Sequence, residues 1–155
     1  MSNSDSGSQS VTLGPNRVTF LIAGEETGGK LSLTEFTAAP PPAPAAPAHR
    51  HLDADETLYI LEGDFQFVLD GQTIPAPVGS YLHVPKGTLH GIENIGTTTG
   101  RILVILTPAG FEGFWAERAQ LPTTAGNQVD AGALLALQEK YHMDTGGRVR
   151  QFFKG

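Results

Sequence analysis

Glycine and proline recur along the whole chain and leave room only for short regular segments between them. The chain has 19 glycines and 11 prolines among its 155 residues. Several of the intervening runs are rich in β-branched and aromatic residues, and some alternate apolar with polar positions, as strands with one buried face do. The runs most typical of strands are 18–22, 30–37, 57–61, 65–69, 72–74, 81–84 and 101–106. This pattern predicts an all-β sandwich or barrel.

A chain of this length, with 39% hydrophobic residues, can bury one sizeable core. We therefore expect a single β-barrel domain over residues 11–120. Residues 1–10 are polar and have neither the basic start nor the apolar stretch of a secretory signal, so they predict a flexible tail on a cytoplasmic protein. The longest apolar run, 102–106, has the length of a strand, whereas a membrane-spanning helix needs about 20 residues.

Beyond Pro108 the spacing of apolar residues becomes helical. The first predicted helix carries Phe111, Phe114, Trp115 and Arg118, and the second runs from a cap at Asp130 through Leu134, Leu135, Leu137 and Tyr141. We expect a C-terminal helical extension over residues 121–155. The aromatic residues of the first helix could pack on the barrel or a second subunit, or form a lid over a site. Packing is favoured, because apolar stripes at helical spacing are usually buried faces.

Charge and cysteine content exclude several functions. The formal net charge is −6 and the basic residues are scattered, whereas binding to a phosphate backbone needs a clustered basic face, so no nucleic-acid partner is expected. Cysteine is absent, which excludes disulfides, a thiolate nucleophile and sulfur ligation of a metal. Any metal ligands must therefore be nitrogen and oxygen atoms.

Three histidines and one glutamate could supply such ligands. His49 and His51 are alternate residues of a predicted strand, so their imidazoles can point to the same face. Glu56 follows after a short polar turn, and His90 follows the turn at 85–87. Three imidazoles and one carboxylate suit one divalent transition metal ion: iron, nickel, manganese, cobalt, copper or zinc.

The spacing of these residues resembles that of the cupin superfamily, whose two motifs are G-x5-H-x-H-x3,4-E-x6-G and G-x5-P-x-G-x2-H-x3-N. The first motif matches from His49 to Gly63, although Ala43 replaces its leading glycine. The second matches at every specified position, which are Gly79, Pro85, Gly87, His90 and Asn94. The resemblance implies a double-stranded β-helix, or jelly-roll, barrel in which His49, His51, Glu56 and His90 bind the metal.

Two other histidines have weaker claims to a role. His83 lies in a predicted strand and could line the cavity or support a ligand, but a packed or outward position is favoured. His142 ends the second predicted helix, where a positive imidazolium complements the helix dipole. We assign neither residue a chemical function.

The metal site predicts a small-molecule substrate. The residues expected to line the barrel, depending on which of them face inward, are Leu58, Ile60, Phe65, Phe67 and Tyr81. A metal can lower the pKa of a substrate oxygen, and Glu56 is the expected catalytic base. Residues 24–29 and 106–115 are loosely similar to single-barrel bacterial cupins related to quercetin-cleaving dioxygenases. That similarity implies oxygenation of a small phenolic or enolic compound.

Two alternatives stand beside the dioxygenase hypothesis. One is a redox-neutral cupin enzyme, such as an isomerase, cyclase or lyase in a biosynthetic pathway. The other is a non-catalytic cupin that binds a small molecule or stores a metal. The edge strands of the barrel and the aromatic helix also predict a homodimer.

Overall fold

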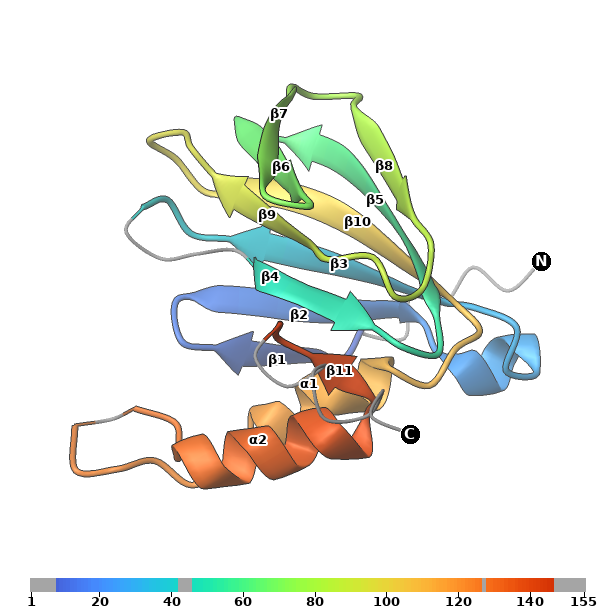
Figure 1. Ribbon diagram of the computed structural model, residues 1–155, viewed down its shortest axis with the longest axis vertical. Coiled ribbons are helices and arrows are strands. Elements are labelled where there is room, and N and C mark those ends of the chain that lie inside the picture. The colour runs from blue at the N-terminus through green and yellow to red at the C-terminus, as the bar shows by residue number, and fades with distance from the viewer. Residues whose placement is uncertain (1–7, 42–45, 127, 147–155) are drawn as a thin grey trace, which may run out of the picture.

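Two antiparallel sheets packed face to face form the body of the protein (Figure 1). The structure is a computed structural model that describes residues 8–41, 46–126 and 128–146. The larger sheet contains, in order, β1 (Ser10–Leu13), β2 (Asn16–Ile22), β3 (Ser32–Ala38), β10 (Gly100–Thr107), β5 (Asp55–Glu62) and β8 (Tyr81–Val84). The smaller contains β11 (Met143–Asp144), β4 (Ala46–His51), β9 (His90–Asn94), β6 (Phe65–Leu69) and β7 (Gln72–Ala76). The predicted all-β, jelly-roll architecture is confirmed.

The core lies between the two sheets and draws on alternate residues of the long strands. Ile60 on β5 and Ile102 on β10 are fully buried from the larger sheet, and Phe65 on β6 faces them from the smaller sheet. Burial of such side chains is the main term that stabilises a two-sheet fold, at roughly 1.5 to 3 kcal/mol for each large apolar side chain. Packing of these side chains thus fixes the two sheets relative to each other.

The β6–β7 hairpin shows how local sequence determines the strand register. Asp70 and Gly71 both have positive φ angles, 47° and 81°, which the two-residue turn of a tight hairpin requires. Leu69 and Gln72 are consequently paired across the turn. The Asp-Gly pair in the sequence correctly predicts this hairpin.

Two short helices follow the last long strand, as expected. They are α1 (Glu112–Arg118) and α2 (Ala131–Lys140), and Asp130 caps α2 by accepting a hydrogen bond from the backbone N–H of Ala133 at 2.8 Å. A single 3₁₀ turn, η1 (Gly24–Thr27), follows β2. Figure 1 shows α1 and α2 together beside β1 and β11, and α1 packs on β1 while α2 packs on β11. Neither helix of the described chain has the length and apolar character needed to span a bilayer.

Parts of the predicted organisation fall outside the described residues. These parts are residues 1–7 of the expected tail, Ala43 in the first motif, and residues 147–155 of the expected C-terminal extension. The described part of that extension contributes α2 and also β11, which pairs with β4. The division of the chain at residue 120 stays a prediction.

Candidate metal centre

Strand β4 places two of the four candidate ligands side by side. His49 and His51 are both buried and face the interior, as the alternation of side chains along a strand predicts. Arg50, between them, is partly exposed and forms an ion pair with Asp144 of β11, with Nη1 and Oδ2 2.9 Å apart. Strand β4 is therefore held by β9 on one edge and by β11 on the other.

The other two candidate ligands come from different sheets. His90 begins β9 and is paired directly with His49 of β4, whereas Glu56 projects from β5 of the larger sheet. The turn that precedes His90 is tied to the β4–β5 connection by two hydrogen bonds. The Gly87 N–H donates to the His51 carbonyl at 2.8 Å, and the Lys86 N–H donates to Asp55 Oδ1 at 2.9 Å. These bonds explain why the turn at 85–87 brings His90 to the other ligands.

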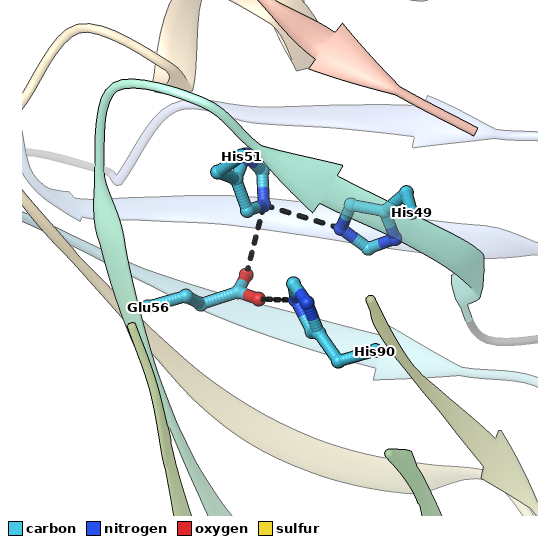
Figure 2. Close-up of side chains that lie close together, drawn as sticks. All are labelled: His49, His51, Glu56 and His90. Atoms are coloured by element: carbon cyan, nitrogen blue, oxygen red, sulfur yellow. Dashed lines mark hydrogen bonds and ion pairs between the residues drawn. The ribbon is translucent and has the colours of Figure 1, made fainter. Parts of the chain in front are cut away.

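The four side chains converge on one point, as Figure 2 shows. All four are buried, and one donor atom from each lies within 4.8 Å of the other three. The Nε2 atoms of His49 and His51 are 3.1 Å apart. Glu56 lies with Oε2 at 2.5 Å from His90 Nε2 and Oε1 at 3.6 Å from His51 Nε2. The structure thus brings together the complete ligand set that the sequence predicts.

Backbone carbonyls orient two of the imidazoles so that Nε2 faces the cluster. A carbonyl oxygen only accepts hydrogen bonds, so the Nδ1–H groups of His49 and His90 donate to it. Their acceptors are the carbonyls of Pro47 at 2.8 Å and Thr88 at 2.9 Å. This arrangement leaves the Nε2 lone pair available to a cation, which is the usual support for a metal-binding histidine. The donor set therefore fits a divalent first-row transition metal.

Burial and mutual contacts shift the protonation of these groups. Burial lowers the pKa of His49 to about 4, which keeps its imidazole neutral and able to bind a metal at neutral pH. Burial alone would raise the pKa of Glu56, but hydrogen bonds from His51 and His90 outweigh it and hold the pKa well below its usual range. Burial also opposes protonation of His90, yet the contact with Glu56 raises its pKa. A metal ion bound at Nε2 would replace the proton that Glu56 favours on His90.

His51 differs from the other two histidines in what supports it. Its Nδ1 is buried without a hydrogen-bond partner among the described residues. Its ring instead meets the ring of Phe111 edge-to-face, with the centroids 4.3 Å apart. The orientation of His51 therefore depends on packing rather than on a hydrogen bond to Nδ1.

The cluster opens into a cavity of about 500 Å³ whose walls are mostly apolar. Of the five residues expected to line it, only Leu58 does so; Ile60, Phe65 and Phe67 are buried in the core away from it, and Tyr81 is 73% exposed. The apolar walls come instead from other strands and from α1, including Phe36, Ile92, Ile102, Val104, Phe114 and Trp115. The sequence could not distinguish core positions from cavity positions on the same inward face.

Helix α1 and the residue before it form one wall of this cavity. Phe111, Phe114 and Trp115 are buried and also line the cavity. The same three side chains therefore pack on the barrel and lie beside the candidate ligands. Arg118 lines the same cavity. Its spacing from Phe111 already predicts that both residues share one helix face, although the sequence alone suggests no role for Arg118.

The remaining histidines lie away from the cluster. His83 is exposed on β8, where its Nδ1 is 2.9 Å from the hydroxyl of Thr57. The sequence favours a packed or outward position for His83, and the structure shows the outward one. His142 is exposed just after α2 and pairs with Asp53.

Comparison with known proteins agrees with this geometry. Residues 36–106 match the family model described as Cupin domain. An uncharacterized protein of Methanocaldococcus jannaschii is 37% identical over 60 residues, which are 39% of this chain and 48% of that protein. The quercetin 2,3-dioxygenase of Bacillus subtilis is 36% identical over 67 residues, which are 43% of this chain and 20% of the enzyme. The match thus spans about half the length of the first relative and a fifth of the second.

The fold has counterparts among solved structures. The polyketide cyclase RemF from Streptomyces resistomycificus superposes with a TM-score of 0.55 at 25% sequence identity, over 65% of this chain and 74% of RemF. KdgF from a Halomonas species superposes with a TM-score of 0.58 at 16% identity, over 68% of this chain and 90% of KdgF, and shows likeness of fold alone. The matched domain, both sequence motifs and the two-sheet architecture show that this chain contains a cupin domain over residues 36–106.

Proposed function

We propose that this protein is a metal-dependent enzyme in which His49, His51, Glu56 and His90 hold one divalent transition metal ion. The observation that carries the proposal is the convergence of four buried donor atoms beside an apolar cavity large enough for a small organic molecule. A cation held between three imidazoles and a carboxylate would offset the cost of burying these polar groups. Iron, nickel, manganese, cobalt, copper and zinc all accept this ligand set.

The side chains around the cluster define what they can do for a substrate. A bound divalent ion would supply Lewis acidity to a substrate oxygen. Glu56 is the only carboxylate among the described residues that line the cavity, so it is the group placed to accept a proton from the substrate. Phe111, Phe114 and Trp115 exclude water and hold an apolar ring system. These roles suit a substrate with an acidic hydroxyl, such as a phenol or an enol.

The first candidate reaction is dioxygenation of a small phenolic or enolic compound. Its support is the 36% identity to part of the quercetin 2,3-dioxygenase of Bacillus subtilis, together with a donor set that redox-active metals accept. This reaction requires molecular oxygen and a redox-tolerant metal with an open coordination position.

The second candidate is a redox-neutral reaction, such as a cyclisation, isomerisation or elimination. Its support is the structural likeness to the polyketide cyclase RemF, which is as extensive as any likeness to an oxygenase described above. Such an enzyme would work without oxygen and would accept zinc. A non-catalytic role, in which the barrel only binds its ligand, is the third candidate.

Metal content and oxygen uptake test these candidates together. Wild-type protein, His90→Ala and the control His83→Ala are purified without added metal or chelator and analysed for their elements. We expect near-stoichiometric metal in the wild type and in His83→Ala, with loss in His90→Ala. Oxygen uptake with a panel of phenols and enols then follows, using metal-loaded protein. Wild-type protein without bound metal would refute metal dependence, and turnover that is unchanged under anaerobic conditions would refute the dioxygenase.

Homodimerisation and a cytoplasmic location belong to the same proposal. The dimer prediction is supported by the unpaired outer edges of β8 and β7, which end the two sheets. Light scattering at micromolar concentrations is expected to give twice the mass of the chain, 16.4 kDa. A monomeric mass over that range would refute it.

A further inference from the structure

Arg118 is a half-buried cation in the cavity that the four candidate metal ligands also line, and its guanidinium has no side-chain partner among the described residues. The other described arginines are all engaged: Arg17 with Ser10, Arg50 with Asp144, and Arg101 with Glu35. No side chain of the described residues forms a hydrogen bond or an ion pair with the Arg118 guanidinium. Partial burial lowers the pKa of Arg118, and no neighbouring carboxylate opposes that effect. A partly desolvated guanidinium without an anion is unfavourable, which indicates a binding function.

The charges of the cavity favour an anionic ligand. Among the described residues that line the cavity, Arg118 and Glu56 are the only ones with a formal charge when the histidines are neutral. A divalent cation held by the cluster would therefore give the cavity a net positive charge. An anion that enters the cavity would reduce this charge and pair with Arg118.

The geometry of α1 separates Arg118 from the four candidate metal ligands along the cavity. Phe111, Trp115 and Arg118 are spaced i, i+4 and i+7, so they share the face of α1 that lines the cavity. The rise between Phe111 and Arg118 is roughly 10 Å along the helix axis. Because Phe111 contacts His51, one ligand can reach the cluster at one end and the guanidinium at the other, with Trp115 alongside its middle.

We propose that Arg118 binds a carboxylate of the substrate, so that the cavity accepts small organic acids with an apolar body. A guanidinium can donate two parallel hydrogen bonds to one carboxylate, which makes it selective for that group over a neutral amide or alcohol. This inference rests on the proposed function, because it assumes that His49, His51, Glu56 and His90 hold a metal ion at the other end of the cavity. Arg118 here determines specificity, and the metal ligands carry the chemistry.

The single tryptophan of the chain provides the measurement. Trp115 is buried in the cavity wall, so its fluorescence reports on occupancy. We would titrate metal-loaded protein with 3-phenylpropionate and with its neutral amide, and verify the affinities by calorimetry. In the wild type the acid is expected to bind about 10-fold more tightly than the amide, because a charge-assisted bidentate contact is lost in the amide.

Three variants test whether Arg118 causes the preference for the acid over the amide. Arg118→Gln is expected to bind acid and amide alike, Arg118→Lys to keep part of the preference, and the exposed control Arg17→Gln to keep all of it. Thermal unfolding checks the fold, and Arg118→Gln is expected to melt no lower than the wild type because it removes an unpaired charge. A lower melting temperature together with an unchanged preference would mean a structural role and would overturn the proposal.

His90→Ala separates this inference from the proposed function. The preference for the acid over the amide could disappear in His90→Ala and persist in Arg118→Gln. This result would show that the metal holds the carboxylate, and it would overturn the role of Arg118. Wild-type protein that binds the acid no better than the amide, or fails to bind the acid, also overturns it. If the purified protein binds no metal and its preference for the acid still depends on Arg118, the proposed function is refuted and the role of Arg118 stands.

Discussion

The ring of Phe111 stands edge-on against the imidazole of His51, with an angle of 82° between the planes. This contact joins the helical wall of the cavity to the strand that carries two ligands. The same Phe111 ring stacks on Phe114 and meets Trp115 edge-to-face, so the contact is the end of a continuous aromatic cluster. Packing in α1 is thereby linked to the orientation of a candidate ligand.

Replacement of Phe111 by alanine is expected to weaken both stability and metal binding. Removing a buried phenylalanine costs about 3 kcal/mol of unfolding free energy, and it would also free the His51 ring to rotate. Phe111→Leu should recover most of the stability and less of the metal binding, because it fills volume without a flat ring. Urea unfolding and elemental analysis measure the two effects. Full metal content in folded Phe111→Ala would contradict the positioning role.

Asn94 is expected to support the fold rather than the metal. Its side-chain amide donates to the carbonyls of Ala38 and Thr98 at 3.1 and 2.9 Å, and its Oδ1 accepts from the Gly96 N–H at 2.9 Å. Asn94→Ala would leave these buried groups unpaired and lower the unfolding free energy by about 2 kcal/mol. Metal content per folded molecule should stay at the wild-type value. A loss of metal without a loss of stability would show that this motif residue acts at the site instead.

A methyl group at Gly24 is expected to displace the helical wall. A Cβ there would lie 2.6 Å from Ala109 Cβ and 2.7 Å from Glu112 Oε1, which is closer than van der Waals contact allows. Gly24→Ala should therefore cost about 1 to 3 kcal/mol of unfolding free energy, as overpacking usually does. Gly126→Ala is the matched control, since nothing lies within 4 Å of a Cβ at that position. Equal thermal stability of the two variants would disprove this steric argument.

Glu112 is expected to stabilise the protein in a pH-dependent way. Burial alone would raise its pKa, but backbone N–H groups, including those of Gly110 at 2.6 Å and Gly24 at 2.9 Å, bind its carboxylate and lower the pKa. A lowered pKa means that the contribution is complete above the unfolded value of about 4.5 and is lost as pH falls through the folded value. At pH 7, Glu112→Gln should lower the unfolding free energy by about 1 kcal/mol. Urea unfolding of both proteins at pH 7 and pH 3 measures the difference, which must shrink at low pH.

The sequence predicts those parts of the fold in which local chemistry determines the outcome. The Asp70-Gly71 turn, the Asp130 cap and the alternation of His49 and His51 each follow from backbone geometry over a few residues. Each of these expectations concerns residues that are close in the sequence or that share a strand. The ligand set as a whole follows instead from the spacing of the cupin motifs, because Glu56 and His90 lie in different sheets.

Features that depend on packing between distant segments could not be predicted in this way. On β3 the buried face carries Ser32 and Thr34, while Leu33 lies on the less buried face, so the polarity of single residues does not identify the inner face. The position of Arg118 depends on how α1 is seated on β1, which helical spacing alone does not reveal. The sequence therefore indicated a metal site but not the composition of its cavity.

The wall that α1 contributes has a consequence for how such proteins diversify. The matched domain ends at residue 106, whereas Phe111, Trp115 and Arg118 lie beyond it. Mutations in this short helix can alter which molecules the cavity admits while every candidate ligand stays in place. Selection can thus act on the shape of the cavity and on the candidate ligands separately, and two descendants of one such gene could share these four residues yet accept different molecules.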